Sequence, residues 1–67
     1  MSILALAAMD KLIRKAGAKR VSEDAKEAMR KLLEDFGGKI ASKSVEFAKH
    51  GGRTTVKATD IELANRN

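Results

Sequence analysis

Residues 22–49 read SEDAKEAMRKLLEDFGGKIASKSVEFAK, a stretch of 28 residues without proline. Ser22 is a favourable helix N-cap, and the carboxylates of Glu23 and Asp24 suit the positive end of a helix dipole. Apolar side chains recur at helical spacing and form one stripe: Ala25, Ala28, Met29, Leu32, Leu33, Phe36 and Ile40. The pattern predicts a helix of about 42 Å at 1.5 Å per residue. Two shorter helices from so small a chain cannot cover it.

Two consecutive glycines, Gly37 and Gly38, lie within this stretch. Each costs about 1 kcal/mol relative to alanine inside a helix, so they could divide it and give a four-helix chain. They could instead let two helix backbones approach closely where long helices cross. Because the apolar stripe continues in phase from Phe36 to Ile40, we expect one unbroken helix.

A shorter helical pattern precedes the long one, from about Ile3 to Ala16. One side of it is apolar at helical spacing, and the opposite side carries three basic residues, Lys11, Arg14 and Lys15. Gly17 follows as a residue that can end a helix with a positive φ. We therefore expect a first helix that presents positive charge on one side.

The last part of the chain begins where His50, Gly51 and Gly52 end the long helix. Residues 53–57 are rich in β-branched side chains and favour a short extended segment. A final helix is expected from about Ala58 to Ala64 or beyond. Thr59 and Glu62 are spaced as a capping box, although the helix could begin a residue or two earlier. The sequence therefore predicts an all-α chain of short, long and short helices.

Length and composition limit the classes of protein that are possible. A chain of 67 residues and 7.3 kDa is expected to form one domain over residues 1–67, and domains of this size are stable only marginally. There is no cysteine and only one histidine, so disulfides, thiolate metal sites and an ordinary zinc site are excluded. No nucleophile–base pair or phosphate-cradling loop is present, and we expect neither an enzyme nor a cofactor. Oligomerisation is the remaining means of stabilisation.

Charge indicates the kind of partner. The formal net charge is +5 and the isoelectric point is near 9.9. This balance favours a polyanion as partner, the alternative being that the basic residues serve only solubility. With two phenylalanines and no tyrosine or tryptophan, the chain lacks the aromatic platforms on which single-stranded bases stack. Duplex DNA is therefore favoured. No apolar run reaches the ~20 residues that span a bilayer, and we expect a cytoplasmic protein with no membrane association.

Two stretches follow a known family in order. Residues 17–22 (GAKRVS) resemble the first helix end and first loop of archaeal histones. Residues 40–42 (IAS) and 48–64 (AKHGGRTTVKATDIELA) resemble their second half, so that the likeness covers essentially residues 9–64. The resemblance implies the histone fold and a handshake dimer, in which each long helix crosses its twin. The partner would then cover the apolar stripe.

The resemblance also implies which residues contact DNA. In that family, a dimer binds DNA at two paired-loop sites and at one site formed by the two first helices. Arg20 would enter the minor groove, oriented by Thr55 from the second loop of the partner, because narrow minor grooves are strongly negative. The remaining contacts would be to phosphates, from Lys57, Lys19, Lys11, Arg14 and Lys15. For each of these the alternative is an ordinary solvated side chain.

Further roles are implied for the second half of the chain. Arg53 and Asp60 match a buried ion pair that joins the second loop to the third helix, the alternative being a weak surface pair. A contact between dimers is implied for Phe47, His50, Asp60 and Leu63, although His50 could simply suit the C-terminus of its helix. By the same analogy Gly17 allows close contact between stacked layers. Successive dimers would then form higher oligomers on DNA.

Some positions depart from the family pattern, and other functions stay open. The apolar opening segment stands where the family usually has proline, Gly38 replaces a usually polar residue, and Thr54 stands where a basic residue is common. The expected function is a homodimeric histone that bends, wraps and compacts duplex DNA on the chromosome, with paralogous histones as possible further partners. One alternative is a histone-fold subunit of a transcription-type complex. The other is a histone-like protein that coats or bridges DNA without wrapping it.

Overall fold

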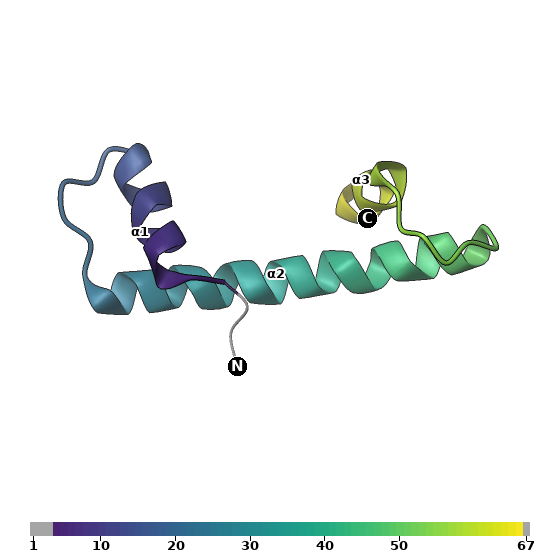
Figure 1. Ribbon diagram of the computed structural model, residues 1–67, viewed down its shortest axis with the longest axis horizontal. Coiled ribbons are helices and arrows are strands. Elements are labelled where there is room, and N and C mark those ends of the chain that lie inside the picture. Colours follow the sequence, from purple (N-terminus) through teal and green to yellow (C-terminus); the bar gives the residue numbers. More distant parts are fainter. Residues whose placement is uncertain (1–3, 67) are drawn as a thin grey trace. The chain divides into compact units, whose positions relative to one another are not determined.

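The computed structural model describes residues 4–66, which contain three α-helices and no strand (Figure 1). Helix α1 spans Leu6–Lys15, α2 spans Glu23–His50 and α3 spans Ala58–Arg66. The expected succession of short, long and short helices is confirmed. The first helix begins later than expected, at Leu6, and Ile3 lies outside the described residues. Residues 53–57 form an irregular connection rather than a strand.

Helix α2 runs without interruption for 28 residues and includes both Gly37 and Gly38. The prediction of one unbroken helix is therefore confirmed. A Cβ atom added at either glycine would meet no described atom within 4 Å apart from its chain neighbours and the adjacent backbone of its own helix. Among residues 4–66 nothing thus requires glycine at these two positions, where alanine would favour the helix by about 1 kcal/mol each.

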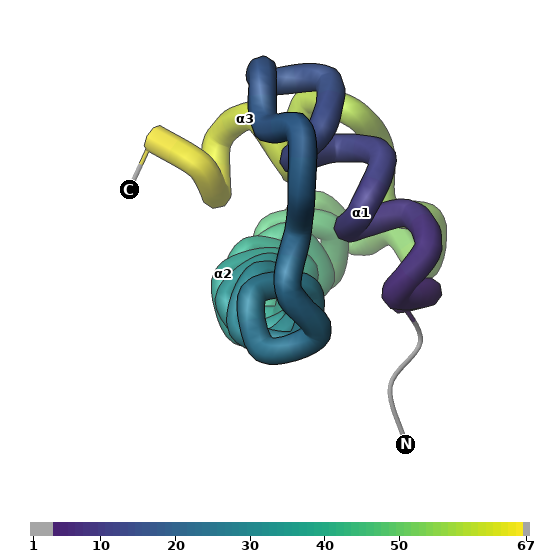
Figure 2. Tube along the Cα trace, turned by 90° about the vertical axis from the view of Figure 1, so that its left-hand side faces the viewer, coloured from purple at the N-terminus to yellow at the C-terminus, as the bar shows by residue number. Residues whose placement is uncertain are grey.

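The chain forms two compact units, one ending at Asp35 and one beginning at Phe36. In the first unit, α1 packs on the beginning of α2 and buries Met9. Figure 2 shows the connecting loop returning to the first turn of α2. The carboxylate of Asp10 in α1 and the ammonium of Lys26 in α2 lie 3.8 Å apart, so that an ion pair links the two helices of this unit.

In the second unit, the chain reverses after His50 and α3 lies beside the end of α2 (Figures 1 and 2). The buried residues at this contact are small: Ser44 and Ala48 of α2 and Ala64 of α3 are each at most 2% exposed. The Ser44 hydroxyl donates to the carbonyl of Ile40 at 2.8 Å, which satisfies this buried hydroxyl. Small side chains therefore let the two helices pack closely.

Helices α1 and α2 end in the same way. After α1, the N–H of Gly17 donates to the carbonyl of Arg14 and that of Ala18 to Ile13. After α2, the N–H of Gly52 donates to Lys49 and that of Arg53 to Ala48. Gly17 has a φ of +119° and Gly52 a φ of +70°, which completes a Schellman motif at each end. The prediction of a positive φ at Gly17 is confirmed.

Helices α2 and α3 begin differently. The Ser22 hydroxyl accepts from the N–H of Ala25 at 3.1 Å, so the predicted N-cap of α2 is confirmed. Helix α3 begins at Ala58, as expected, so Thr59 lies inside the helix and is not its N-cap. The carboxylate of Asp60 accepts the N–H of Lys57 at 2.8 Å and reaches back from inside the helix. An acidic residue one position later than Thr59 therefore supplies the cap.

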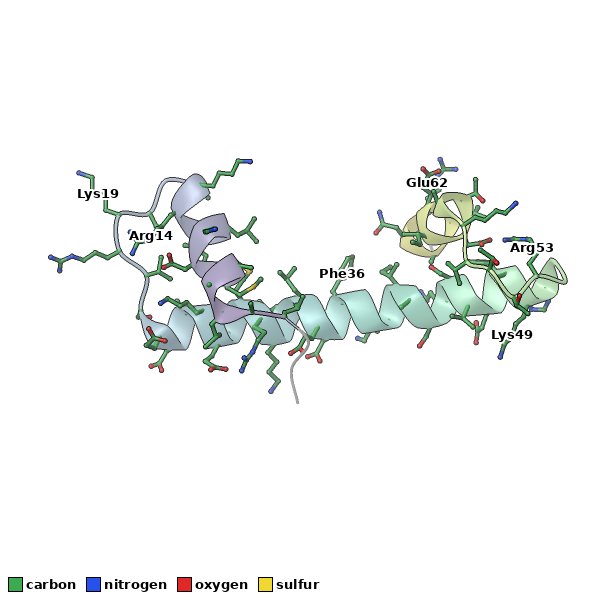
Figure 3. The ribbon with its side chains drawn as sticks, viewed as in Figure 1. Arg14, Lys19, Phe36, Lys49, Arg53 and Glu62 are labelled. Carbon is green, nitrogen blue, oxygen red and sulfur yellow. The ribbon has the colours of Figure 1, made fainter. Side chains whose placement is uncertain are left out.

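Large apolar side chains are exposed in both units. Leu32 is 66% exposed and Phe36 is 59% exposed, and Figure 3 shows Phe36 standing clear of α2. The other exposed large apolar residues are Leu12, Leu33, Val45, Val56, Ile61 and Leu63. In the second unit an open apolar groove is lined by Phe36, Gly37, Ile40, Ala41, Ile61, Glu62 and Asn65. An exposed apolar groove of this kind usually marks a surface that another molecule covers.

Candidate nucleic-acid interface

The basic residues of the first unit fall into two groups. Five of them are exposed and form no ion pair with a carboxylate among residues 4–66. One is Lys31 of α2, and the other four lie on α1 and the first loop: Lys11, Lys15, Lys19 and Arg20. Figure 3 shows Lys19 extending from the first loop. The cations in the second group are neutralised locally, since Lys26 pairs with Glu23 at 2.9 Å and Arg30 pairs with Glu27. Uncompensated positive charge is thus concentrated on α1 and the first loop.

Arg14 lies among the exposed cations and differs from them in its contacts. Its Nε donates to Oδ2 of Asp10 at 2.9 Å, one helical turn earlier, and its Nη1 donates to the carbonyl of Lys19 at 2.8 Å. Figure 3 places the Arg14 side chain beside the loop that carries Lys19. The guanidinium therefore joins α1 to the loop that follows it. Its expected role as a phosphate contact stays a prediction.

The same network reaches the start of α2. Oδ1 of Asp10 is buried and accepts no hydrogen bond in the described structure, and the ammonium of Lys26 lies 3.8 Å from it. That ammonium also contacts Oε1 of Glu23 at 2.9 Å. Asp10 is thus the junction between the first helix, the first loop and the first turn of α2.

The second loop is held by Arg53. Its Nη1 and Nη2 donate to Oδ2 and Oδ1 of Asp60, each at 2.9 Å, and its Nη1 also donates to the carbonyl of Thr55 at 3.1 Å. Arg53 and Asp60 are the two residues expected to pair, and the carboxylate is only 2% exposed. Two parallel N–H···O bonds fix the guanidinium plane. The pair therefore sets the path of the loop between Arg53 and α3.

Electrostatics follow from this geometry. The hydrogen bonds from Arg53 and from the N–H of Lys57 stabilise the charged carboxylate and lower the pKa of Asp60 from 3.8 to about 2. The hydrogen bond to Asp60 in turn raises the pKa of Arg53. Both groups are therefore charged across the physiological pH range. Thr55 and Lys57, the residues expected to meet DNA in this loop, are exposed on either side of Val56.

The residues expected between dimers have different environments. His50 and Leu63 are exposed and Phe47 is half-buried. Asp60 is buried, and both of its oxygens already accept hydrogen bonds within the second unit. Gly17, expected at a contact between layers, is exposed and ends α1. These assignments to assembly contacts stay predictions.

Within residues 4–66 no group of three or more His, Asp or Glu side chains could hold a metal ion. None of the helices in that range is both long enough and apolar enough to cross a membrane. The link made by Asp10 and Arg14 was missed by the sequence reasoning, which assigned Arg14 to DNA and left Asp10 aside. Their spacing of four residues was the available signal, since such pairs face each other on a helix.

Comparisons with known proteins agree with this architecture. Residues 3–64 match the family described as histone-like transcription factor (CBF/NF-Y) and archaeal histone. One of the subunits of the archaeal histone HAN1 of Thermococcus zilligii is 53% identical over 64 residues, which are 96% of each chain. The probable archaeal histone 3 of Methanocaldococcus jannaschii is 44% identical over 66 residues, 98% of each chain.

A more distant likeness extends to a eukaryotic histone. Histone H4 of Dictyostelium discoideum is 37% identical over 57 residues, which are 85% of this chain and 53% of the histone. The family match spans almost the whole chain and includes both loops described above. With its short, long and short helices, the chain belongs to the histone-fold family of archaeal histones and CBF/NF-Y-type transcription factors.

Proposed function

We propose that this protein is a histone that binds duplex DNA as a homodimer, without strict sequence preference, and bends or wraps it. The observation that carries the proposal is the distribution of charge in the first unit. Lys11, Lys15, Lys19 and Arg20 have no carboxylate partner among the described residues, whereas two of the three cations of α2 in that unit, Lys26 and Arg30, are paired. Cations that are free to release the counterions of phosphates supply most of the affinity in such binding.

The exposed apolar surface supports the dimer. Leu32 and Phe36 are more than half exposed on α2, and an apolar groove opens beside Phe36 in the second unit. A second copy of the chain, crossing at the middle of α2, would cover these side chains. No contact within the described part of the chain requires the residues at 37 and 38 to be small, and a crossing helix would supply such a reason. The homodimer follows as the smallest assembly that removes this surface from water.

On DNA, Arg20 is proposed to enter the minor groove and Thr55 of the other chain to orient its guanidinium. Lys19 and Lys57 would contact the phosphates that flank the groove, and Lys11 and Lys15 those at the first-helix site. Arg20 and Thr55 are both exposed, and their loops are anchored by Arg14 and Arg53 respectively. Such contacts neutralise phosphates and carry no base readout, so specificity would come from the cost of bending.

Dimers are proposed to assemble along DNA through Phe47, His50, Leu63 and the neighbourhood of Asp60, with Gly17 at contacts between layers. The exposure of His50 and Leu63 supports this surface. His50→Ala should shorten the assemblies that sediment with DNA. Unchanged assembly size with this variant would remove His50 from the contact. Paralogous histones could take the place of the second chain, and the assemblies would lie on the chromosome in the cytoplasm.

Digestion of the protein–DNA complex with micrococcal nuclease tests the proposal. The nuclease is applied at several ratios of protein to DNA, at low and at moderate salt. Protected fragments that grow in regular steps support wrapping by dimers that add one at a time. Protection without steps supports coating or bridging instead, and no protection at low salt overturns the DNA-binding proposal.

A second candidate is a histone-fold subunit that requires a different partner chain. The observation in its favour is that the 53% identical relative is itself named as one subunit of a histone. Sedimentation of the purified chain at micromolar concentration separates the two. A stable homodimer supports the first proposal, whereas a monomer that binds DNA only after addition of a second histone-fold chain supports the second.

A further inference from the structure

The first loop is anchored at both ends within the first unit. At one end the carbonyl of Lys19 accepts the hydrogen bond from Nη1 of Arg14 at 2.8 Å. At the other end Ser22 caps α2 through the N–H of Ala25 at 3.1 Å. Only Arg20 and Val21 lie between these two anchors, and Val21 is half-buried. The backbone at Arg20 is therefore held close to one path.

Arg14 contacts Asp10 and Lys19 at the same time. The Nε–Oδ2 contact of 2.9 Å orients the guanidinium, whose planar fork then directs Nη1 at the carbonyl. Asp10 is in turn placed against α2 by Lys26, with 3.8 Å between Oδ1 and Nζ. The chain of contacts runs from α2 through Asp10 and Arg14 to the loop.

Charge makes Arg14 a weak candidate for a phosphate contact. Its guanidinium is already paired with a carboxylate, whereas Lys11, Lys15, Lys19 and Arg20 carry uncompensated charge. A phosphate would have to compete with Asp10 for Nε or repel Asp10 at close range. The contacts in the structure instead make Arg14 a tether that holds the first loop through the carbonyl of Lys19.

We infer that Asp10 and Arg14 are positioning residues that present Arg20 to DNA, and that Arg14 itself does not bind phosphate. This inference rests on the proposed DNA-binding function. Asp10 contributes a negative charge to a DNA-binding protein, and removing it should still weaken binding. If net charge alone determined affinity, removing this negative charge would strengthen DNA binding.

Thermal stability is expected to change little when the tether is broken. The side chain of Arg14 is 51% exposed and that of Asp10 is 24% exposed, and pairs of this kind contribute little to folding. Breaking the tether should weaken DNA binding because the loop becomes more flexible, and ordering Arg20 on binding then costs more conformational entropy. DNA affinity should therefore change more than stability does.

Asp10→Asn and Asp10→Ala form a matched pair. Both raise the formal net charge of +5 by one, but only asparagine keeps an oxygen that can accept the Nε–H of Arg14. Affinity for a duplex of mixed sequence is measured at several salt concentrations, with folding checked by circular dichroism. Asp10→Ala should bind about three- to tenfold more weakly than Asp10→Asn, the range expected for one hydrogen bond.

Trypsin gives a second readout that does not need DNA. Cleavage after Lys19 and Arg20 should be faster in Asp10→Ala than in Asp10→Asn, because cleavage requires a loosened loop. Arg14→Lys, which keeps the net charge but cannot bridge both acceptors in the same way, should also bind DNA more weakly than the unaltered chain. A phosphate contact would instead tolerate lysine.

Each outcome has one meaning. Wild-type protein that fails to bind DNA at low salt overturns the proposed function. Wild-type binding with equal affinities for Asp10→Asn and Asp10→Ala overturns the inference alone. Faster cleavage of Asp10→Ala with no difference in affinity would show a tether without a role in DNA binding, and would also overturn it. Weaker binding and faster cleavage together support it.

Discussion

The two units of this molecule use the same chemical device at their loops. In each, an arginine near a Schellman helix end joins an aspartate to a backbone carbonyl of the adjacent loop. Arg14 contacts Asp10 and the carbonyl of Lys19, whereas Arg53 contacts Asp60 and the carbonyl of Thr55. The difference is burial: the side chain of Asp60 is 2% exposed and that of Asp10 is 24% exposed.

This difference in burial gives the two aspartates different roles, since Asp60 stabilises the fold and Asp10 orients a neighbouring side chain. Asp60 accepts three hydrogen bonds, one of which caps α3, so its unit depends on it. Asp10 accepts one short hydrogen bond, from an arginine that is half in water. Removing one partner of a buried pair leaves a costly unpaired charge, while exposed pairs contribute little. The same contact can therefore hold a fold together in one loop and only orient a side chain in the other.

The largest effect is expected for Asp60→Ala. It would leave Arg53 without its carboxylate and α3 without its cap. We expect the melting temperature to fall by more than about 10 °C, measured by circular dichroism at one protein concentration. Asp10→Ala, the same substitution in the other unit, is the control and should change the melting temperature by a few degrees at most. Equal decreases in melting temperature for the two variants would show that the two aspartates contribute equally to stability despite their different burial.

Acid should affect the same pair. The pKa of Asp60 is about 2 in the folded protein and 3.8 without its partners. A carboxyl group with a lowered pKa stabilises the fold fully above its unfolded pKa, so this contribution is complete above about pH 4 and is lost towards pH 2. The melting temperature should therefore fall as the pH is lowered from 5 to 2. The Asp60→Asn variant should have a lower melting temperature at pH 5 and a smaller decrease between pH 5 and pH 2. A decrease as large as that of the unaltered chain would mean that other carboxylates cause it.

The helices were predictable because their signals are local. Apolar periodicity, the Ser22 cap and the glycine at 17 each lie within one or two turns of what they determine. The cap of α3 was mistaken because Thr59 and Glu62 match the local pattern, whereas Asp60 is oriented by Arg53, seven residues earlier. A partner beyond the next helical turn does not show in a local motif.

The candidate site was predictable by residue type and less so by role. The loop residues from Lys19 to Arg20 and from Thr55 to Lys57 carry the resemblance to archaeal histones, and all of those expected at DNA are exposed. The separate use of Arg14 depends on the Schellman turn at Gly17, which brings the carbonyl of Lys19 back to α1. Sequence spacing shows Asp10 facing Arg14, but the chain reversal that completes the tether appears only in three dimensions.

Glycine substitutions would test whether the two helix ends are equivalent. Both Gly17 and Gly52 have positive φ, which costs other residues about 1–2 kcal/mol. Gly52, at +70°, lies near the left-handed region that alanine can reach, while Gly17 at +119° lies beyond it. Gly17→Ala should therefore lower the free energy of unfolding more than Gly52→Ala, as measured by urea denaturation. The reverse order would mean that the Arg53–Asp60 ion pair makes the turn at Gly52 less tolerant of a side chain than the turn at Gly17.

The smallest effect is expected at the start of α2, where the first loop ends. Ser22→Ala removes the acceptor for the N–H of Ala25 and should cost about 1 kcal/mol of unfolding free energy, whereas Ser22→Asp should keep the cap. Ser42→Ala, at an exposed position inside the same helix, is the matched control and should be close to neutral. Because Ser22 is also the second anchor of the Arg20 loop, Ser22→Ala should speed tryptic cleavage after Arg20 as Asp10→Ala does. Loss of stability without faster cleavage would leave Arg14 as the only effective anchor of that loop.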